Sequence, residues 1–175
     1  FEFAQLASDQ RILVQAAAGG VGHLAVQIAK WRGAHVIGTA SARNADYLRA
    51  IGVDEVIDYH AVRFEDVVHD VDVVLETVGG ENAARSLSVI KRGGIFVSIV
   101  GLPAPEILSR YDVRAERMLV RPEASQLTEI ARLIDAGTIK PNVDAVFPLA
   151  EVGKAHALGE PGHTRGKIVL KVASE

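Results

Sequence analysis

Apolar and polar positions along the chain follow two periods in turn. Helical spacing is clearest in one segment, where Val21, Leu24 and Ile28 fall on one face. Other apolar runs have the length and β-branched content of buried parallel strands, and they lie at 12–16, 35–39, 55–59, 71–75 and 95–100. Strands that alternate with helices in this way predict an α/β fold: a doubly wound parallel sheet of the Rossmann type, with helices on both faces.

Further segments extend this pattern. Helical spacing predicts helices at 44–51, 81–91 and 123–136. The run 112–120 alternates as an edge strand does, and 102–110 is predicted as a loop because of its prolines. Near the start, Phe3, Leu6 and Ala7 are typical of the last turns of an amphipathic helix. We therefore expect the chain to be a piece of a longer protein.

The pattern changes at about Gly137. Two prolines bracket an extended run, a short helix is predicted at 150–158, and a last strand at 167–172. These extended segments have no helical crossover that would place them in the main parallel sheet. We predict a Rossmann domain over 1–136 and assign the extended segments of 137–175 to another domain.

Composition narrows the class of protein. The 175 residues are 49% hydrophobic and 23% charged, with a formal net charge of −3, which gives no sign of a nucleic-acid or membrane partner. The sequence contains no cysteine, so disulfides and thiolate metal sites are excluded. No apolar run approaches the ~18 residues of a membrane span. A soluble cytoplasmic protein is the expectation.

A cluster of small residues joins the first strand to the first helix. The segment 14–23 reads VQAAAGGVGH, and the three glycine positions of a dinucleotide-binding turn fall at Ala17, Gly19 and Gly22. A helix N-terminus aims backbone N–H groups at an anion, and the absence of Cβ atoms admits a pyrophosphate. The alternative is a turn that only packs a helix on a sheet.

The end of the second strand decides between NAD and NADP. An acid there would accept hydrogen bonds from a free ribose 2′-OH. This chain has Ala40, followed by Ser41 and Arg43. A hydroxyl and a guanidinium suit a 2′-phosphate, with charge-assisted bonds worth roughly 1.5–3 kcal/mol each. The alternative is that Ser41 caps the next helix and Arg43 is a solvated charge; NADP(H) is the prediction.

Two further strand ends are candidates for the nicotinamide half of the site. Segments 77–79 and 100–102 follow the fourth and fifth strands, and cofactors lie across the carboxyl ends of parallel strands. Strand-ending glycines would look the same without a ligand. The six histidines do not cluster at metal spacing and are expected on the surface, and no catalytic acid can be named.

Longer motifs carry a family resemblance. AAAGGVGHLAVQIAKWRGAHVIGTAS, LETVGG, KRGGIFVSIVGLP and RGKIVLKV resemble the zinc-independent medium-chain dehydrogenase/reductases of the quinone oxidoreductase (zeta-crystallin-like) group. The resemblance implies that 1–136 is the NADP(H)-binding Rossmann domain and that 137–175 is a C-terminal segment of a substrate domain that is mostly missing. The stretch 165–167 matches a part of that family that approaches the cofactor. The resemblance and the strand ends together assign cofactor contacts as follows: Gly19, Gly20, Val21 and Gly22 at the pyrophosphate, Ser41 and Arg43 at the 2′-phosphate, Tyr59 by the adenosine, and Thr77, Val78, Val100, Gly101 and Leu102 by the nicotinamide.

The resemblance implies a function for the longer protein. Members of this group pass a hydride from NADPH to a quinone or an α,β-unsaturated carbonyl and commonly dimerise through the edge strand, here 112–120. The group's N-terminal half, which forms the other wall of the substrate cleft, is absent from this sequence, so the fragment alone is expected to be inactive. Two alternatives stay open: a binding protein that keeps NADPH without turnover, and an S-adenosylmethionine-dependent methyltransferase, against which Ala40 argues.

Overall fold

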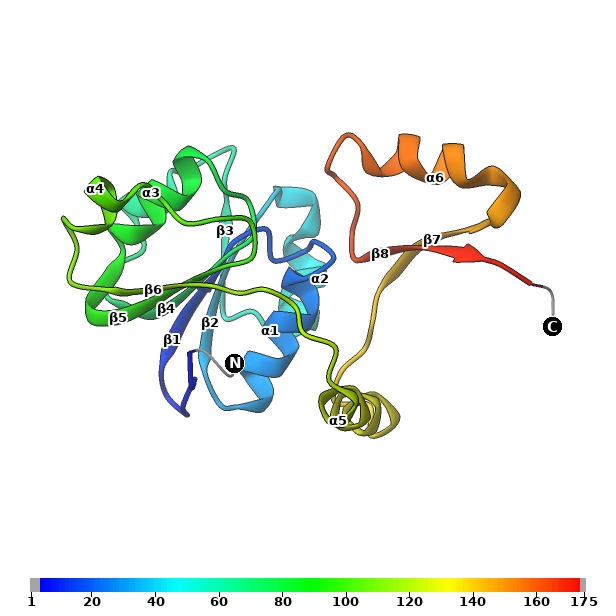
Figure 1. Ribbon diagram of the computed structural model, residues 1–175, viewed down its shortest axis with the longest axis horizontal. Helices are drawn as coiled ribbons and strands as arrows, with labels where there is room; N and C mark the ends of the chain where they lie inside the picture. Colours follow the sequence, from blue (N-terminus) through cyan, green and yellow to red (C-terminus); the bar gives the residue numbers. More distant parts are fainter. Residues whose placement is uncertain (1–3, 174–175) are drawn as a thin grey trace.

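The computed structural model describes residues 4–173 and contains a six-stranded parallel sheet (Figure 1). Its strands run in the order β3-β2-β1-β4-β5-β6, the order of a dinucleotide-binding fold. They are β1 (Arg11–Val14), β2 (His35–Ala40), β3 (Glu55–Asp58), β4 (Val71–Glu76), β5 (Ile90–Ser98) and β6 (Arg114–Arg117). The predicted α/β Rossmann fold is confirmed, and the alternating run 112–120 provides an edge strand, β6, as expected.

Helices cover both faces of this sheet, and each face has its own apolar core. On one face, α1 (Gly22–Trp31), η1 (Ala42–Asn44) and α2 (Ala45–Ala50) enclose a cluster that includes Val14, Val26 and Leu48. On the other, η2 (Phe64–Asp66) and α3 (Glu81–Leu87) enclose a cluster that includes Leu13, Leu87 and Phe96. Successive residues of β1 thus point to opposite cores, as a strand buried on both faces requires.

Several predicted boundaries are wrong. The helix expected over 81–91 ends at Leu87, and Ile90 already pairs with Val71 as the first residue of β5. The predicted loop 102–110 holds a short helix, α4 (Pro105–Leu108). The predicted N-terminal helix is absent from residues 4–10, which form turns, although Leu6 is buried; Phe3 lies outside the described residues.

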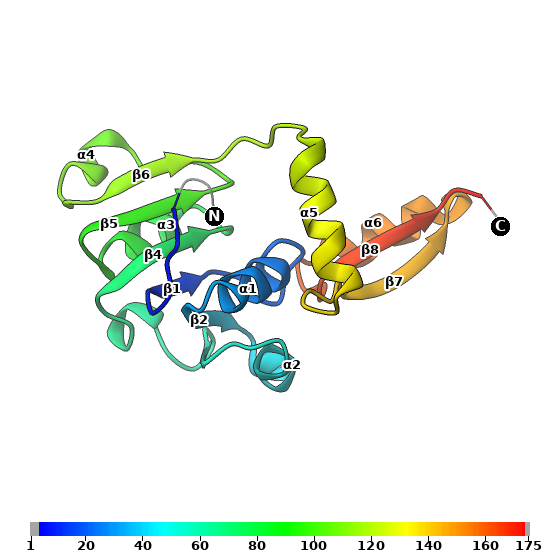
Figure 2. The ribbon, with the colours of Figure 1, turned by 90° about the horizontal axis from the view of Figure 1, so that it is seen from below.

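The C-terminal part of the chain forms a sheet of its own. After α5 (Ala124–Asp135), strand β7 (Val143–Pro148) pairs in parallel with β8 (Lys167–Lys171). Between them lie η3 (Leu149–Glu151) and α6 (Val152–Gly159), which packs on both strands. Figures 1 and 2 show this sheet apart from the six-stranded one. A domain boundary between residues 136 and 137 stays a prediction.

Hydrogen bonds attach this C-terminal part, which we call the tail (residues 137–173), to α1 and to the turn before it. Gln27 on α1 accepts from the amide of Lys140 at 2.8 Å and donates to its carbonyl at 3.2 Å. The amide of Gly166 donates to the carbonyl of Ala18 at 2.9 Å. The start of β8 is therefore fixed against the small-residue turn that follows β1. In the part of the chain that the structure describes, no helix is long and apolar enough to cross a membrane.

Candidate cofactor-binding site

The small-residue turn after β1 is a tightly packed loop. Ala16 has a positive φ of 47°, and its carbonyl accepts from the amide of Gly19 at 2.9 Å. A Cβ on Gly22 would lie 2.3 Å from that carbonyl oxygen and 2.7 Å from Cα of Ala17. Gly22 is therefore required for α1 to begin this close to β1. The first turn of α1 carries no acidic residue, so its positive dipole end is available to an anion.

A cavity of about 90 Å³ lies where β1 and β2 end, and it collects the residues predicted for the adenosine side. Among the residues that line it are Gly19, Ser41, Arg43 and Tyr59. Ala40, at the end of β2, lines it as well, and none of the described residues that line it is acidic. The structure thus brings together residues from the turn, from η1 and from the segment after β3. This lining is compatible with a phosphorylated ribose.

The tail closes one side of this cavity. The Arg43 guanidinium donates to the carbonyl of His163 at 2.8 Å, and Nε of Arg165 donates to Oδ1 of Asn44 at 2.9 Å. Thr164 also lines the cavity, and its buried Oγ1 has no hydrogen-bond partner in the structure. A buried hydroxyl without a partner is costly in a folded protein. Periodicity and composition did not indicate Thr164; the nearest signal was the family stretch 165–167.

Lys167 brings a cation to the glycine-rich turn. Its Nζ lies 3.0 Å from where a Cβ on Gly20 would stand. This ammonium adds positive charge beside the N-terminus of α1, where the resemblance places a pyrophosphate. Val21, also expected at the pyrophosphate, is 39% exposed. The turn and Lys167 together form a cationic, side-chain-poor surface.

The residues expected by the nicotinamide lie in two loops apart from that cavity. Val78, Val100 and Leu102 are exposed, and none of them lines the cavity that holds Ser41. The loops are adjacent, since a Cβ on Gly79 would lie 3.1 Å from Cγ2 of Val100. Their side chains form an exposed apolar surface beside the ends of β4 and β5.

Strand-end side chains hold both loops in place. The buried Glu76 carboxylate, the last residue of β4, accepts from the amides of Val78 at 2.7 Å and Gly79 at 2.9 Å. At the end of β5, Oγ of Ser98 accepts from the amides of Val100 at 3.2 Å and Gly101 at 3.1 Å. Each loop is therefore fixed by the last residue of its own strand.

A buried chain of polar side chains links the end of β4 to the ends of β1 and β2. Thr39 Oγ1 donates to Oε1 of Gln15 at 2.6 Å, and Nε2 of Gln15 donates to Oγ of Ser86 at 3.1 Å. Ser86 in turn donates to Glu76 at 3.0 Å, while Oγ1 of Thr77 donates to the carbonyl of Gln15 at 2.8 Å. Such a satisfied network makes the relative positions of β1, β2 and β4 rigid.

The expectation that all histidines lie on the surface is wrong for His23. This residue is in the first turn of α1 and is fully buried. Its Nδ1 lies 2.8 Å from the carbonyl oxygen of Gly19, and Nε2 accepts from the amide of Asn142 at 3.2 Å. Burial lowers the pKa of His23, the Gly19 carbonyl raises it, and the charge of Lys167 lowers it further; the net direction is down.

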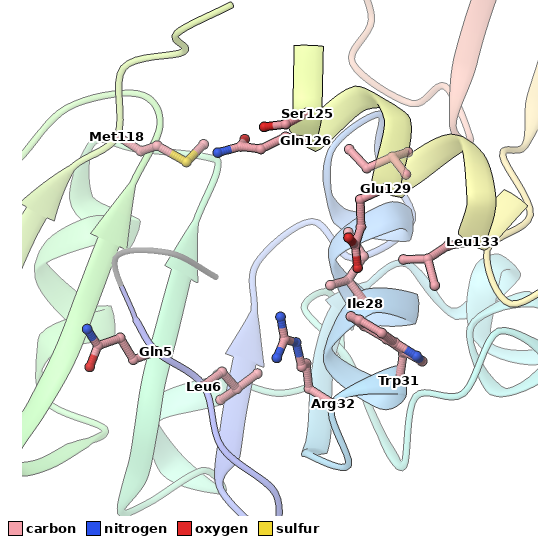
Figure 3. A pocket seen from close by; sticks show the side chains of 11 residues that line it. Gln5, Leu6, Ile28, Trp31, Arg32, Met118, Ser125, Gln126, Glu129 and Leu133 are labelled. Atoms are coloured by element: carbon pink, nitrogen blue, oxygen red, sulfur yellow. The ribbon is translucent and has the colours of Figure 1, made fainter. Parts of the chain in front are cut away.

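A larger cavity, of about 720 Å³, lies elsewhere, between α1 and α5 (Figure 3). We call it the α1–α5 groove; Leu6, Trp31, Met118 and Leu133 are among its lining residues. None of the residues predicted to contact the cofactor lines it. The larger of these two cavities is therefore not the predicted cofactor site. Within residues 4–173, no three His, Asp or Glu side chains gather where they could hold a metal ion.

Comparison with known proteins places this geometry in a family. Residues 51–170 match the family described as zinc-binding dehydrogenase. The NADPH-dependent alkenal/one oxidoreductase of Arabidopsis thaliana chloroplasts is 32% identical over 170 residues, which cover 95% of this chain and 42% of that protein. The chain spans about half the length of the curated relatives it matches.

Solved structures agree over almost the whole chain. The quinone oxidoreductase from Coxiella burnetii superposes with a TM-score of 0.93 at 35% identity, over 98% of this chain and 56% of that one. The Escherichia coli quinone oxidoreductase complexed with NADPH gives a TM-score of 0.84 at 28% identity, over 96% and 59%. The chain therefore belongs to the zinc-binding dehydrogenase family, in the quinone oxidoreductase-like group of the medium-chain dehydrogenase/reductases.

Proposed function

We propose that this chain is the NADP(H)-binding part of a zinc-independent oxidoreductase that transfers hydride to a quinone or an α,β-unsaturated carbonyl. The observation that carries the proposal is the cavity at the end of β2, where Ser41, Arg43 and Tyr59 meet the glycine-rich turn and where residues 4–173 contribute no acid. The names of its relatives, which include quinone and alkenal/one oxidoreductases, support the substrate class.

The residues present fit this cofactor. Arg43 supplies a guanidinium, Ser41 a hydroxyl, and Thr164 a buried hydroxyl that lacks a partner. Lys167 and the N-terminus of α1 supply positive charge for a pyrophosphate. An acid at the end of β2 would repel a 2′-phosphate, and Ala40 stands there instead.

The contribution of the chain to such a reaction is positioning. When bound, the reduced nicotinamide supplies the hydride. The loops fixed by Glu76 and Ser98 present Val78, Val100 and Leu102 as an apolar border for the nicotinamide, which keeps water from the reacting face. No acid or base is needed from these loops for hydride transfer itself.

Cofactor preference tests the proposal. We expect NADPH to bind at least ~10-fold more tightly than NADH, because one charge-assisted bond is worth about a decade in affinity. The substitution Arg43→Ala is expected to remove most of this preference and to leave the affinity for NADH nearly unchanged, as measured by fluorescence titration. Equal affinities for NADPH and NADH in the unmodified protein would contradict the proposal. Binding of S-adenosylmethionine, with no binding of NADPH or NADH, would indicate the methyltransferase alternative.

We also propose that two copies associate through the edge strand, in the region 112–120. Within residues 4–173, β6 is the last strand of its sheet and pairs with β5, and the edge of a sheet can add a strand from a second copy. Leu119 and Val120, just beyond β6, are 64% and 87% exposed. Two such edges related by a two-fold axis would pair antiparallel and join two sheets into one.

Backbone N–H groups along a strand point alternately to one side and the other, and this identifies a substitution that tests the interface. The amide of Met118 donates to the carbonyl of Ser98 on β5 at 2.9 Å. By alternation, the amide of Arg117 points to the outer edge. Arg117→Pro removes an outward donor while sparing the pairing with β5, so it should give monomers in light scattering. A folded Arg117→Pro protein that stays dimeric would contradict the interface.

A further inference from the structure

His23 occupies a position where both ring nitrogens are committed. It follows Gly22 directly in the first turn of α1, is fully buried, and contacts two backbone groups. A peptide N–H can only donate, so Nε2 must accept from Asn142, and the ring hydrogen must sit on Nδ1, from which it donates to the carbonyl of Gly19. The partners thus assign one neutral tautomer.

Asn142, just before β7, is bonded to the stretch 165–167 at the start of β8. Its carbonyl accepts from the amide of Lys167 at 2.9 Å, and its Nδ2 donates to the carbonyl of Arg165 at 2.7 Å. Gly166 crosses it so closely that a Cβ there would lie 2.3 Å from the Asn142 carbonyl oxygen. The position of the residue at 142 therefore sets the position of the cationic stretch 165–167.

The surroundings of His23 oppose a positive charge. The turn 16–21 offers no titratable side chain. The tail segments packed beside it carry Lys140, Arg165 and Lys167, together with Asp144, which accepts from the amide of Arg165. Protonation would also place an Nε2–H against the N–H of Asn142, two donors face to face.

We propose that His23 is a positioning residue that, only while neutral, latches the tail to the glycine-rich turn and so keeps Lys167 and Arg165 beside the bound dinucleotide. The idea rests on the proposed cofactor site. Protonation replaces an acceptor by a donor, Asn142 loses its partner, and the stretch 165–167 moves away from the turn. Cofactor affinity then falls as the pH falls below about 6.5, the pKa of a free imidazole.

A purely electrostatic role for His23 would have the opposite sign. A pyrophosphate near the ring would stabilise the imidazolium, so NADPH would bind more tightly as the pH falls. The 2′-phosphate of NADPH also titrates near pH ~6, so the effect of His23 must be taken as the difference between matched variants. Substitutions at His23 and at a second histidine of the tail provide such a matched set.

His23→Gln keeps an acceptor near the position of Nε2 and cannot titrate. His23→Leu fills the space but leaves Asn142 without an acceptor at every pH. His156→Gln, at an exposed residue of α6, removes a histidine from elsewhere in the tail. The probes are NADPH and NADH titrations at pH 7.5 and 5.5, hydrogen-exchange protection of the amides of residues 142 and 166, and ¹⁵N imidazole spectra.

We expect the His23 spectrum to show a protonated Nδ1 and a bare Nε2 at pH 7.5. Between pH 7.5 and 5.5, NADPH affinity and tail protection should each fall at least ~3-fold more in the native protein and in His156→Gln than in His23→Gln. His23→Leu should lack the protection at both values of pH.

An Nε2–H tautomer, protection that does not depend on residue 23, or NADPH affinity that rises in the native protein relative to His23→Gln would overturn the latch. If NADPH does not bind at pH 7.5, the proposed cofactor site fails. The tautomer and the tail protection are measured without cofactor, so they still decide whether the latch exists.

Discussion

The six-stranded sheet and the tail are held in place by different forces. The sheet is buried between two apolar clusters, with Leu13, Val14 and Phe96 completely inaccessible. Beyond residue 136, the buried apolar side chains of the described chain are Ile139 and Ala155. The tail is instead attached to α1 and the turn by a few hydrogen bonds to backbone groups.

This difference indicates two levels of stability within one chain. Apolar burial contributes roughly 25 cal/mol per Å², so the sheet should unfold as a cooperative unit. A few hydrogen bonds of about 1 kcal/mol each allow the tail to open locally while the sheet stays folded. The cofactor site lies on the border between the two regions, which makes binding sensitive to both.

The largest expected effect comes from the core of the sheet. Phe96→Ala should destabilise the protein by about 3–5 kcal/mol, because it removes a fully buried aromatic ring from one of the two apolar clusters. Val169→Ala on β8, at a residue that is 38% exposed, should cost far less. Urea unfolding followed by circular dichroism measures both, and equal losses would contradict the two-level description.

The next effect concerns the glycine-rich turn, where both regions meet the cofactor. A Cβ on Gly22 would collide with backbone atoms of Ala16 and Ala17, so Gly22→Ala should cost about 1–3 kcal/mol and abolish NADPH binding. Gly153→Ala in α6 is the matched control, since a Cβ there meets nothing within 4 Å. It should be neutral or stabilise by roughly 0.5–1 kcal/mol. Normal binding by a folded Gly22→Ala protein would place the site elsewhere.

A smaller and more local effect is expected at the tail attachment. Gln27→Leu removes both hydrogen bonds to Lys140, so exchange of the amide of residue 140 should speed up roughly 5-fold for each ~1 kcal/mol lost. Gln27→Glu keeps the acceptor and should lose less protection. Amides in β1 and β4 should not change; if they did, the tail would be part of the cooperative core.

The smallest expected effect on overall stability is that of acid. The tail should lose its attachment at a higher pH than the one at which the sheet is destabilised. The pKa of His23 is below 6.5 in the folded chain, so the unfolded or detached form binds more protons there, and tail protection is lost as the pH falls below about 6.5. Burial raises the pKa of Asp54, but hydrogen bonds from Lys30 and Val36 lower it more. Its contribution to the sheet is therefore present above about pH 3.8 and is lost as the pH falls through its lowered pKa.

Hydrogen exchange and near-UV circular dichroism between pH 8 and 3 can test this order. The tail amides should lose protection in the imidazole range while the sheet keeps its native signal. A single transition for both regions would contradict the separation. Asp54→Asn should reduce only the change at low pH.

The sequence predicted what depends on local pattern. The strands of the sheet and the turn between β1 and α1 follow from apolar period and small residues. The bounds of the first four strands were close to the observed ones, whereas β5 begins at Ile90 and not at 95, and β6 is shorter than the predicted run 112–120. Ile90 was assigned to a helix because it follows Leu87 at helical spacing. Isoleucine is equally common in strands, and only the pairing with Val71 in the folded chain places Ile90 in β5. α4 is a single short turn after a proline, and its length gives no periodicity to detect.

The site was predictable to the extent that it lies on one βαβ unit. Arg43 and Tyr59 follow strand ends, and parallel strands bring those ends together. The burial of His23 could not be predicted, because its partner Asn142 is 119 residues away. The positions of Lys167 and Thr164 at the site could not be predicted for the same reason, since both residues belong to the tail. Only the family resemblance of 165–167 indicated that part of the chain. Long-range contacts between two weakly coupled regions leave no local pattern.

The proposed cofactor site lies at the border of the two regions and not in the larger α1–α5 groove. Backbone amide chemical shifts during an NADPH titration test this directly. We predict shifts in three segments: the turn around residues 19–22, the segment 41–43 with Tyr59, and the tail stretch 164–167. Shifts confined to the groove, around Leu6, Trp31 and Leu133, would contradict it.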